Sequence, residues 1–132
     1  MADQFPENFR DLFDKKAFGQ LGTIMKDGTP QVTPVWCDFD GKYVRVNSAL
    51  GRVKDRNIRR NPHVAITLQD PDNPYRYVSV KGTVEEITLE GADAHINALS
   101  LKYIGQDPYP GHKPEETRVI YKIRPERVST MG

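Results

Sequence analysis

The chain has 132 residues, 37% of them hydrophobic and 28% charged, and a formal net charge of +1. This length suits one domain, and the modest charge with ample hydrophobicity excludes a disordered chain. A near-neutral balance also argues against a dedicated nucleic-acid or membrane-surface protein, which would be strongly basic. The only cysteine, Cys37, cannot form an intrachain disulfide, and no apolar run reaches the ~18 residues of a membrane span. We expect a cytoplasmic protein with a single domain over residues 1–132.

The predicted elements are mostly strands joined by turns. Phe9, Leu12 and Phe13 lie on one side of a helical wheel, which indicates a short amphipathic helix near the start. The Asp-Gly pairs at Asp27 and Asp40 are hairpin signals. Six strands, mostly in hairpins, predict a mainly β fold, a small antiparallel barrel with short helices. In chain order we expect a helix over 7–17, strands over 19–25, 30–39 and 43–49, a helix over 51–61, strands over 63–69 and 75–88, a helix over 89–103 and a last strand over 117–123.

Two residues inside these strands interrupt the pattern. Gly82 is expected to mark a bulge, because glycine inside a strand has no side chain to pack. Pro34 has no N–H to donate to a neighbouring strand, so its strand is an edge at that point or is interrupted. An interrupted strand would leave backbone groups free to bind the edge of a flat heterocycle. The alternative is an ordinary edge strand with Trp36 in the core.

Several kinds of site are not supported by the sequence. No glycine-rich dinucleotide fingerprint or phosphate-binding loop of the Walker type is present. The three histidines, His63, His95 and His112, are far apart and have no cysteine or carboxylate at ligand spacing, so we expect no metal. Cys37 lies in a strand pattern and is interpreted as a small buried hydrophobe.

A basic cluster follows the third predicted strand. Asn47 and Ser48 offer side-chain donors, and the next turn leads into a helix whose N-terminus favours negative charge. Arg52 can donate two hydrogen bonds to a phosphate, and Lys54 adds a point charge. The alternative is a solvated basic helix, because phosphate sites and solvated basic faces share this composition. The segment Tyr75–Tyr77 could also stack on a planar ligand, although such residues are often cross-strand partners.

Taken together, these segments resemble the pyridoxamine-phosphate-oxidase-like split β-barrel flavoproteins, and most closely their branch of deazaflavin oxidoreductases that use coenzyme F-420. The resemblance runs from about Phe18 to the end of the chain. The segment from Arg52 to Pro62 is its most specific part. The matching segments are 28–36, 46–66, 72–82 and 121–128.

The resemblance implies a six-stranded split barrel of the FMN-binding type that forms a homodimer with two cofactor sites at the subunit interface. Phosphate would be held by Asn47, Ser48, Arg52 and Lys54. Tyr75 and Tyr77 match positions at which the partner subunit approaches the cofactor. The deazaflavin ring would lie along Gln31, Thr33, Pro34, Val35 and Trp36, where Pro34 departs from the polar residue of other members.

The implied chemistry is hydride transfer between F-420 and a small conjugated or heteroaromatic compound, in which the cofactor supplies the reactive carbon. Tyr77 could donate a proton to the reduced substrate, as could solvent. The alternatives are an FMN-dependent oxidase or reductase of the same fold, or a protein that carries a flavin without turnover. The acidic tail of F-420 would favour peripheral cations, and the candidates are Lys15, Lys16, Arg56, Arg59 and Arg60.

Overall fold

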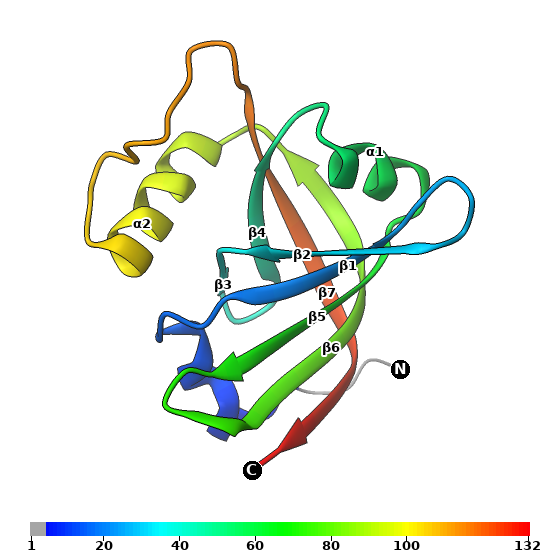
Figure 1. Cartoon of the computed structure of the whole chain (residues 1–132), viewed down its shortest axis with the longest axis vertical. Helices are drawn as coiled ribbons and strands as arrows, with labels where there is room; N and C mark the ends of the chain where they lie inside the picture. The colour runs from blue at the N-terminus through cyan, green and yellow to red at the C-terminus, as the bar shows by residue number, and fades with distance from the viewer. Residues whose placement is uncertain (1–4) are drawn as a thin grey trace.

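The computed structural model describes residues 5–132 and is built around a seven-stranded antiparallel sheet that curls into an open barrel (Figure 1). The strand order is β2-β1-β5-β6-β7-β4-β3, so the two edge strands are neighbours in sequence. This mainly β architecture confirms the predicted fold class. The strands are β1 (Gly19–Ile24), β2 (Pro30–Val35), β3 (Cys37–Phe39), β4 (Val44–Ala49), β5 (His63–Asp70), β6 (Asn73–Thr88) and β7 (Arg118–Met131).

Trp36 connects the two edges of the sheet. The sequence predicted one strand over 30–39, but the structure divides it into β2 and β3, which gives seven strands in place of six. Pro34 is not the point of division, because it stays opposite Gln20 in the β1–β2 register. Since β2 is an edge strand, a residue without an N–H is tolerated there. The barrel therefore opens beside Trp36, between β2 and β3.

The longest strands are β6 and β7. The bulge predicted at Gly82 is confirmed by a register shift between Lys81 and Gly82. A Cβ atom at Gly82 would collide with the backbone oxygen of Arg124, so the two strands approach too closely for any side chain there. Strand β7 continues through Pro125 to Met131, well beyond the predicted end at residue 123.

Three short helices complete the fold: η1 (Glu7–Phe13), α1 (Val53–Arg60) and α2 (Ala92–Ile104). The first is a 3-10 helix that ends at Phe13, four residues before the predicted end, and it buries Phe9, Leu12 and Phe13 against the barrel. On α2, the Tyr103 hydroxyl donates a 2.7 Å hydrogen bond to the backbone oxygen of Ala17. None of the helices in the described residues is long and apolar enough to cross a membrane.

Candidate functional site

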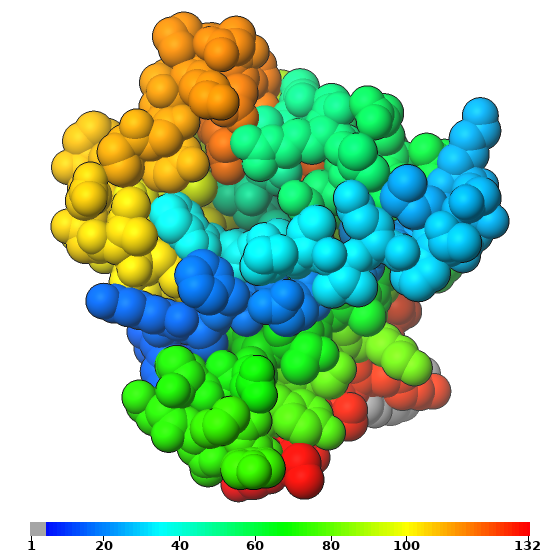
Figure 2. All heavy atoms as spheres, viewed as in Figure 1, coloured from blue at the N-terminus to red at the C-terminus, as the bar shows by residue number. Residues whose placement is uncertain are grey.

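A cavity of about 250 Å³ lies at the opening of the barrel, between α1, α2 and the β2–β3 junction. Figure 2 shows the molecular surface hollowed between the yellow helix α2, the green region of α1 and the cyan strand β2. The cavity brings together residues that lie far apart in the chain. The lining residues are Phe18, Pro34, Val35, Trp36, Asn47, Arg52, Lys54, Ile96, Tyr109 and Arg118.

Three cationic side chains converge on this cavity: Arg52, Lys54 and Arg118. Burial lowers the pKa of Lys54, and repulsion by the two arginines lowers it further. Burial likewise lowers the pKa of Arg118, and repulsion by Arg52 adds to that effect. The carboxylate of Glu116 offsets part of this charge, 2.8 Å from Arg52 Nη2. The cluster remains cationic, which makes the cavity chemically suited to a phosphate group.

Helix α1 presents Lys54 to the cavity because the start of the helix is fixed to the barrel. Asp55 is buried, accepts a 3.0 Å hydrogen bond from the Gly51 N–H and a 2.7 Å bond from the Tyr121 hydroxyl, and pairs with Arg59. Burial alone would raise the pKa of Asp55, but these hydrogen bonds favour the carboxylate and lower the pKa overall. Asp55 therefore anchors the turn that carries Arg52 and Lys54.

Asn47 lines the cavity, but its polar atoms are already satisfied within the protein. Its Nδ2 donates to the Ala92 oxygen at 2.9 Å and to His95 Nδ1 at 3.2 Å, while its Oδ1 accepts from Arg118 Nε at 2.9 Å. The sequence analysis treated Asn47 as a phosphate donor, whereas the structure gives both of its N–H groups to protein acceptors. Its role in this cavity is to orient Arg118.

The hydrogen bonds of Asn47 continue into a buried polar network. Because His95 Nδ1 accepts from Asn47, its Nε2 carries the proton and donates to Asp38 Oδ2 at 3.1 Å. Asp38 in turn accepts two hydrogen bonds from Arg45, at 2.8 and 2.9 Å. Burial would raise the pKa of Asp38, but His95 and Arg45 reverse the shift and lower it. The network fixes the orientation of Asn47 and hence of Arg118.

Only some of the remaining predicted phosphate and ring residues line the cavity. Ser48 is fully buried and does not line the cavity, because it lies on the opposite face of β4 from Asn47. Gln31 and Thr33 also lie outside the lining, and Gln31 Oε1 instead accepts a 3.5 Å hydrogen bond from Thr23. The ring-binding residues that the structure brings to the cavity are Pro34, Val35 and Trp36.

Aromatic side chains hold Trp36 in a fixed position. Its ring stacks on Tyr103, with centroids 5.3 Å apart and an interplanar angle of 5°, and Phe18 stacks against the same tyrosine. Tyr109 contacts Trp36 edge-on at 5.7 Å. Sequence reasoning missed Phe18, Tyr109 and Arg118, since no motif marks them. The one sequence feature that could have indicated Arg118 is its position as a cation at the start of a strand. In the structure this strand pairs with the strand that carries Asn47.

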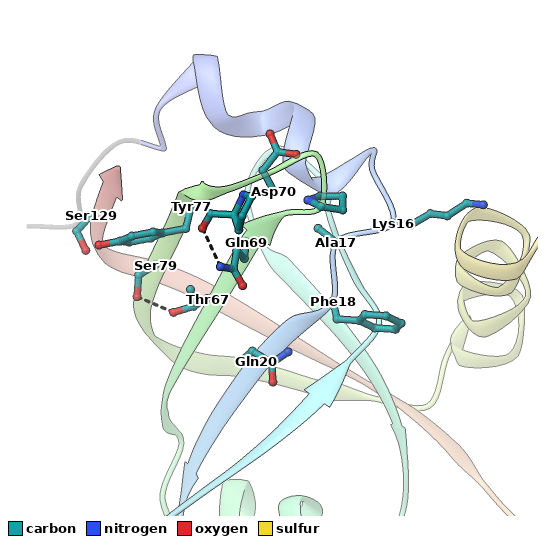
Figure 3. A pocket seen from close by; sticks show the side chains of 12 residues that line it. Lys16, Ala17, Phe18, Gln20, Thr67, Gln69, Asp70, Tyr77, Ser79 and Ser129 are labelled. Atoms are coloured by element: carbon teal, nitrogen blue, oxygen red, sulfur yellow. Dashed lines mark hydrogen bonds between the residues drawn. The ribbon is translucent and has the colours of Figure 1, made fainter. Parts of the chain in front are cut away.

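Tyr75 and Tyr77 do not line this cavity in their own chain. Tyr75 is 77% exposed, and Tyr77 faces a separate open groove of about 780 Å³ (Figure 3). Phe18 lines both hollows and thus marks where they approach each other. A cross-strand row of uncharged polar residues forms the floor of the groove: Gln20, Thr67, Ser79 and Ser129.

The peripheral cations that the sequence analysis named for an acidic cofactor tail differ in how far their charges are already paired within the protein. Lys15 forms ion pairs with Asp70 and Asp72, both at 3.0 Å, so its charge is used to attach the N-terminal segment to the β5–β6 hairpin. Arg59 pairs with Asp55, whereas Arg56 is exposed and donates to the Gly51 oxygen. Arg60 donates a long, 3.4 Å hydrogen bond to Asn57, and Lys16 lines the larger groove.

The three histidines and Cys37 do not form a site with one another. Within residues 5–132, no group of histidine, cysteine and acidic side chains is arranged to hold a metal ion. Cys37 is fully buried, and its backbone N–H donates a 3.2 Å hydrogen bond to the Tyr103 hydroxyl oxygen. Burial raises the pKa of its thiol to about 11, which disfavours the thiolate. Cys37 therefore belongs to the core.

A split barrel with a cationic cavity at its opening defines a class of protein suited to phosphate-bearing ligands. Residues 5–132 match the pyridoxamine 5'-phosphate oxidase family, and the chain belongs to that family. A solved F-420 reductase is 40% identical, with a TM-score of 0.82 over 94% of this chain and 98% of that one. A conserved hypothetical protein of Mycobacterium tuberculosis is 26% identical, with a TM-score of 0.73 over 92% and 81%. General stress protein 26 of Bacillus anthracis, at 19% identity and a TM-score of 0.71 over 95% and 92%, shares the fold.

Proposed function

We propose that this protein is an F-420-dependent oxidoreductase that reduces a small conjugated or heteroaromatic compound. The observation that carries the proposal is the convergence of Arg52, Lys54 and Arg118 on one cavity beside Trp36. Similarity to an F-420 reductase across nearly the whole length of both chains favours the deazaflavin over FMN. When bound, F-420 supplies the carbon that accepts and donates the hydride.

In this proposal the cavity binds the phosphate end of the cofactor. Its volume of about 250 Å³ lies below the roughly 300–1,000 Å³ typical of pockets that enclose a whole ligand. The three cations would bind the phosphate oxygens, with Asn47 holding Arg118 in place. Trp36 and Pro34 would support one face of the ring. Arg56, on the helix that also provides Lys54, is exposed and would be available to meet an acidic tail.

A second copy of the chain would cover the other face of the ring, so the proposed functional unit is a homodimer. The outer face of β1, β5 and β6 has small side chains at Gly22 and Ala65, which would let another sheet approach closely. Tyr75 and Tyr77 border this face and do not line the cavity of their own chain. In the dimer they would approach the cofactor of the partner subunit, where Tyr77 could donate a proton to the reduced substrate.

Binding of oxidised F-420 and of FMN tests the cofactor assignment. The only tryptophan is Trp36, so quenching of its fluorescence reports a ring that binds at this position. Arg52→Ala and Lys54→Ala should each weaken F-420 binding by about 1.5–3 kcal/mol, the range for hydrogen bonds to charged groups. Lys26→Ala, in an exposed turn, is the matched control and should bind normally. Submicromolar FMN binding without F-420 binding would assign the protein to the FMN-dependent alternative.

Turnover and oligomeric state complete the test. Reduced F-420 should be oxidised in the presence of a suitable conjugated acceptor, whereas tight binding without turnover across an acceptor panel would indicate a carrier. Sedimentation of the wild-type protein should give a dimer. Ala65→Arg should give monomers that no longer bind F-420, because no partner subunit then covers the other face of the ring. A monomeric wild-type protein with full affinity would contradict the dimer proposal.

A further inference from the structure

Glu116 places a negative charge inside the cationic cluster. Its Oε2 lies 2.8 Å from Arg52 Nη2 and 3.6 Å from Arg118 Nη1, and its side chain is only 18% exposed. A carboxylate at this point lowers the positive potential that a bound phosphate would experience. The neighbouring Glu115 is exposed, and no ion pair involves it in the part of the chain that the structure describes.

The main chain on both sides of Glu116 is fixed. Its own N–H donates to the Lys113 oxygen at 3.0 Å, and the oxygen of the next residue, Thr117, accepts from the Leu50 N–H at 2.9 Å. Strand β7 begins immediately afterwards, at Arg118. Moving the Glu116 backbone away from the cavity would break these contacts, so only a change of its side-chain rotamer could take the carboxylate away from Arg52 and Arg118.

We propose that Glu116 is a specificity-determining residue that favours a phosphodiester over a terminal phosphomonoester. This inference rests on the proposed function. Coulomb repulsion scales with the product of the charges, so Glu116 opposes a dianion about twice as strongly as a monoanion. A terminal phosphomonoester has a charge of about −1.5 to −2 at pH 7. FMN has such a group, whereas the phosphate of F-420 is a diester with a single negative charge.

Glu116→Gln removes the charge and keeps the size of the side chain, and Glu115→Gln is the matched control. Dissociation constants would be measured by Trp36 fluorescence for riboflavin, F-420 and FMN, which present no charge, one charge and two charges at this position. Glu116→Gln should bind FMN about tenfold and F-420 about threefold more tightly, the magnitude expected for a screened interaction near a surface. Riboflavin binding should not change, and Glu115→Gln should leave all three constants unchanged.

Two probes without a ring separate this inference from the cofactor assignment. Inorganic phosphate at pH 8 and dimethyl phosphate should raise the melting temperature of Glu116→Gln more than that of the wild type, with the larger gain for inorganic phosphate. If the additional rise in the melting temperature of Glu116→Gln is the same for both probes, the bound anion merely displaces the Glu116 side chain. If both probes raise the melting temperature of Glu116→Gln less than that of the wild type, Glu116 only orients the arginines. Either result overturns the inference. If the phosphate probes behave as expected but neither flavin nor deazaflavin binds, the proposed function fails instead.

Discussion

Arg118 Nε donates a 2.9 Å hydrogen bond to Asn47 Oδ1, so a strand residue that resembles a phosphate ligand in the sequence instead holds another cation in position. The pairing depends on the β4–β7 register, which places Arg118 opposite Ala49, two residues from Asn47. Because both N–H groups of the Asn47 side chain donate to protein acceptors, the proposed phosphate contacts would come from the charged side chains of the cavity. Anion binding in this cavity would therefore depend more on charged groups, and less on neutral hydrogen-bond donors, than the sequence indicates.

Replacement of Arg118 should impair anion binding as much as replacement of Arg52. Arg118→Ala removes a buried guanidinium whose hydrogen bond to a phosphate would contribute about 1.5–3 kcal/mol, or at least about tenfold in the dissociation constant. Arg124→Ala is the control, because Arg124 lies on the same strand but pairs with Glu85 and Glu126 away from the cavity. Isothermal titration of each variant with oxidised F-420, the proposed cofactor, measures the difference. Unchanged affinity in Arg118→Ala would remove this residue from the proposed site.

Stability should fall in acid as Asp70 becomes protonated. A hydrogen bond from the Asp72 N–H, together with Arg76 and Lys15, lowers the pKa of Asp70 to about 2 from its ordinary value of 3.8. A carboxyl group with a lowered folded-state pKa stabilises the fold above its unfolded pKa, and the contribution disappears as the pH falls toward 2. In Asp70→Asn the melting temperature should fall less between pH 4 and pH 2 than it does in the wild type. A slope equal to that of the wild type would contradict this assignment.

Cys37 should be inert in the folded protein. Its pKa of about 11 leaves almost no thiolate at pH 8, and the side chain is fully buried. Ellman's reagent should therefore react at pH 8 only after urea unfolds the chain, and then with one equivalent, because there is no other cysteine. Rapid modification of the native protein would show that this part of the core opens readily.

The bulge at Gly82 should not tolerate a side chain. In Gly82→Ala the new methyl group would meet the Arg124 oxygen and the Ile123 side chain, and overpacking of this kind costs about 1–3 kcal/mol. Gly22→Ala is the matched control, because its nearest neighbour, the Ala65 oxygen, lies at an ordinary 3.7 Å. Urea denaturation should separate the two variants. Equal stabilities would show that β6 and β7 can move apart at this point.

The amino-acid sequence was enough to predict the class of fold and two of the cations that line the cavity. Strand alternation, Asp-Gly turns and Gly82 depend on local chemistry, and the structure retains each of them. Arg52 and Lys54, both at the start of α1, were also identified correctly as neighbours, and they line the same cavity. These features depend on residues close together in the chain, where local geometry restricts the possible arrangements.

The residues that come to the cavity from distant parts of the chain could be identified only in the folded structure. The division at Trp36, the position of Arg118 and the charge of Glu116 inside the cluster depend on the β4–β7 register and on the closure of the sheet. Strand alternation separated Asn47 from Ser48, and the contacts with α2 used the free donors of Asn47. No local pattern encodes such relationships, because they depend on which strands become neighbours once the hydrophobic core has formed.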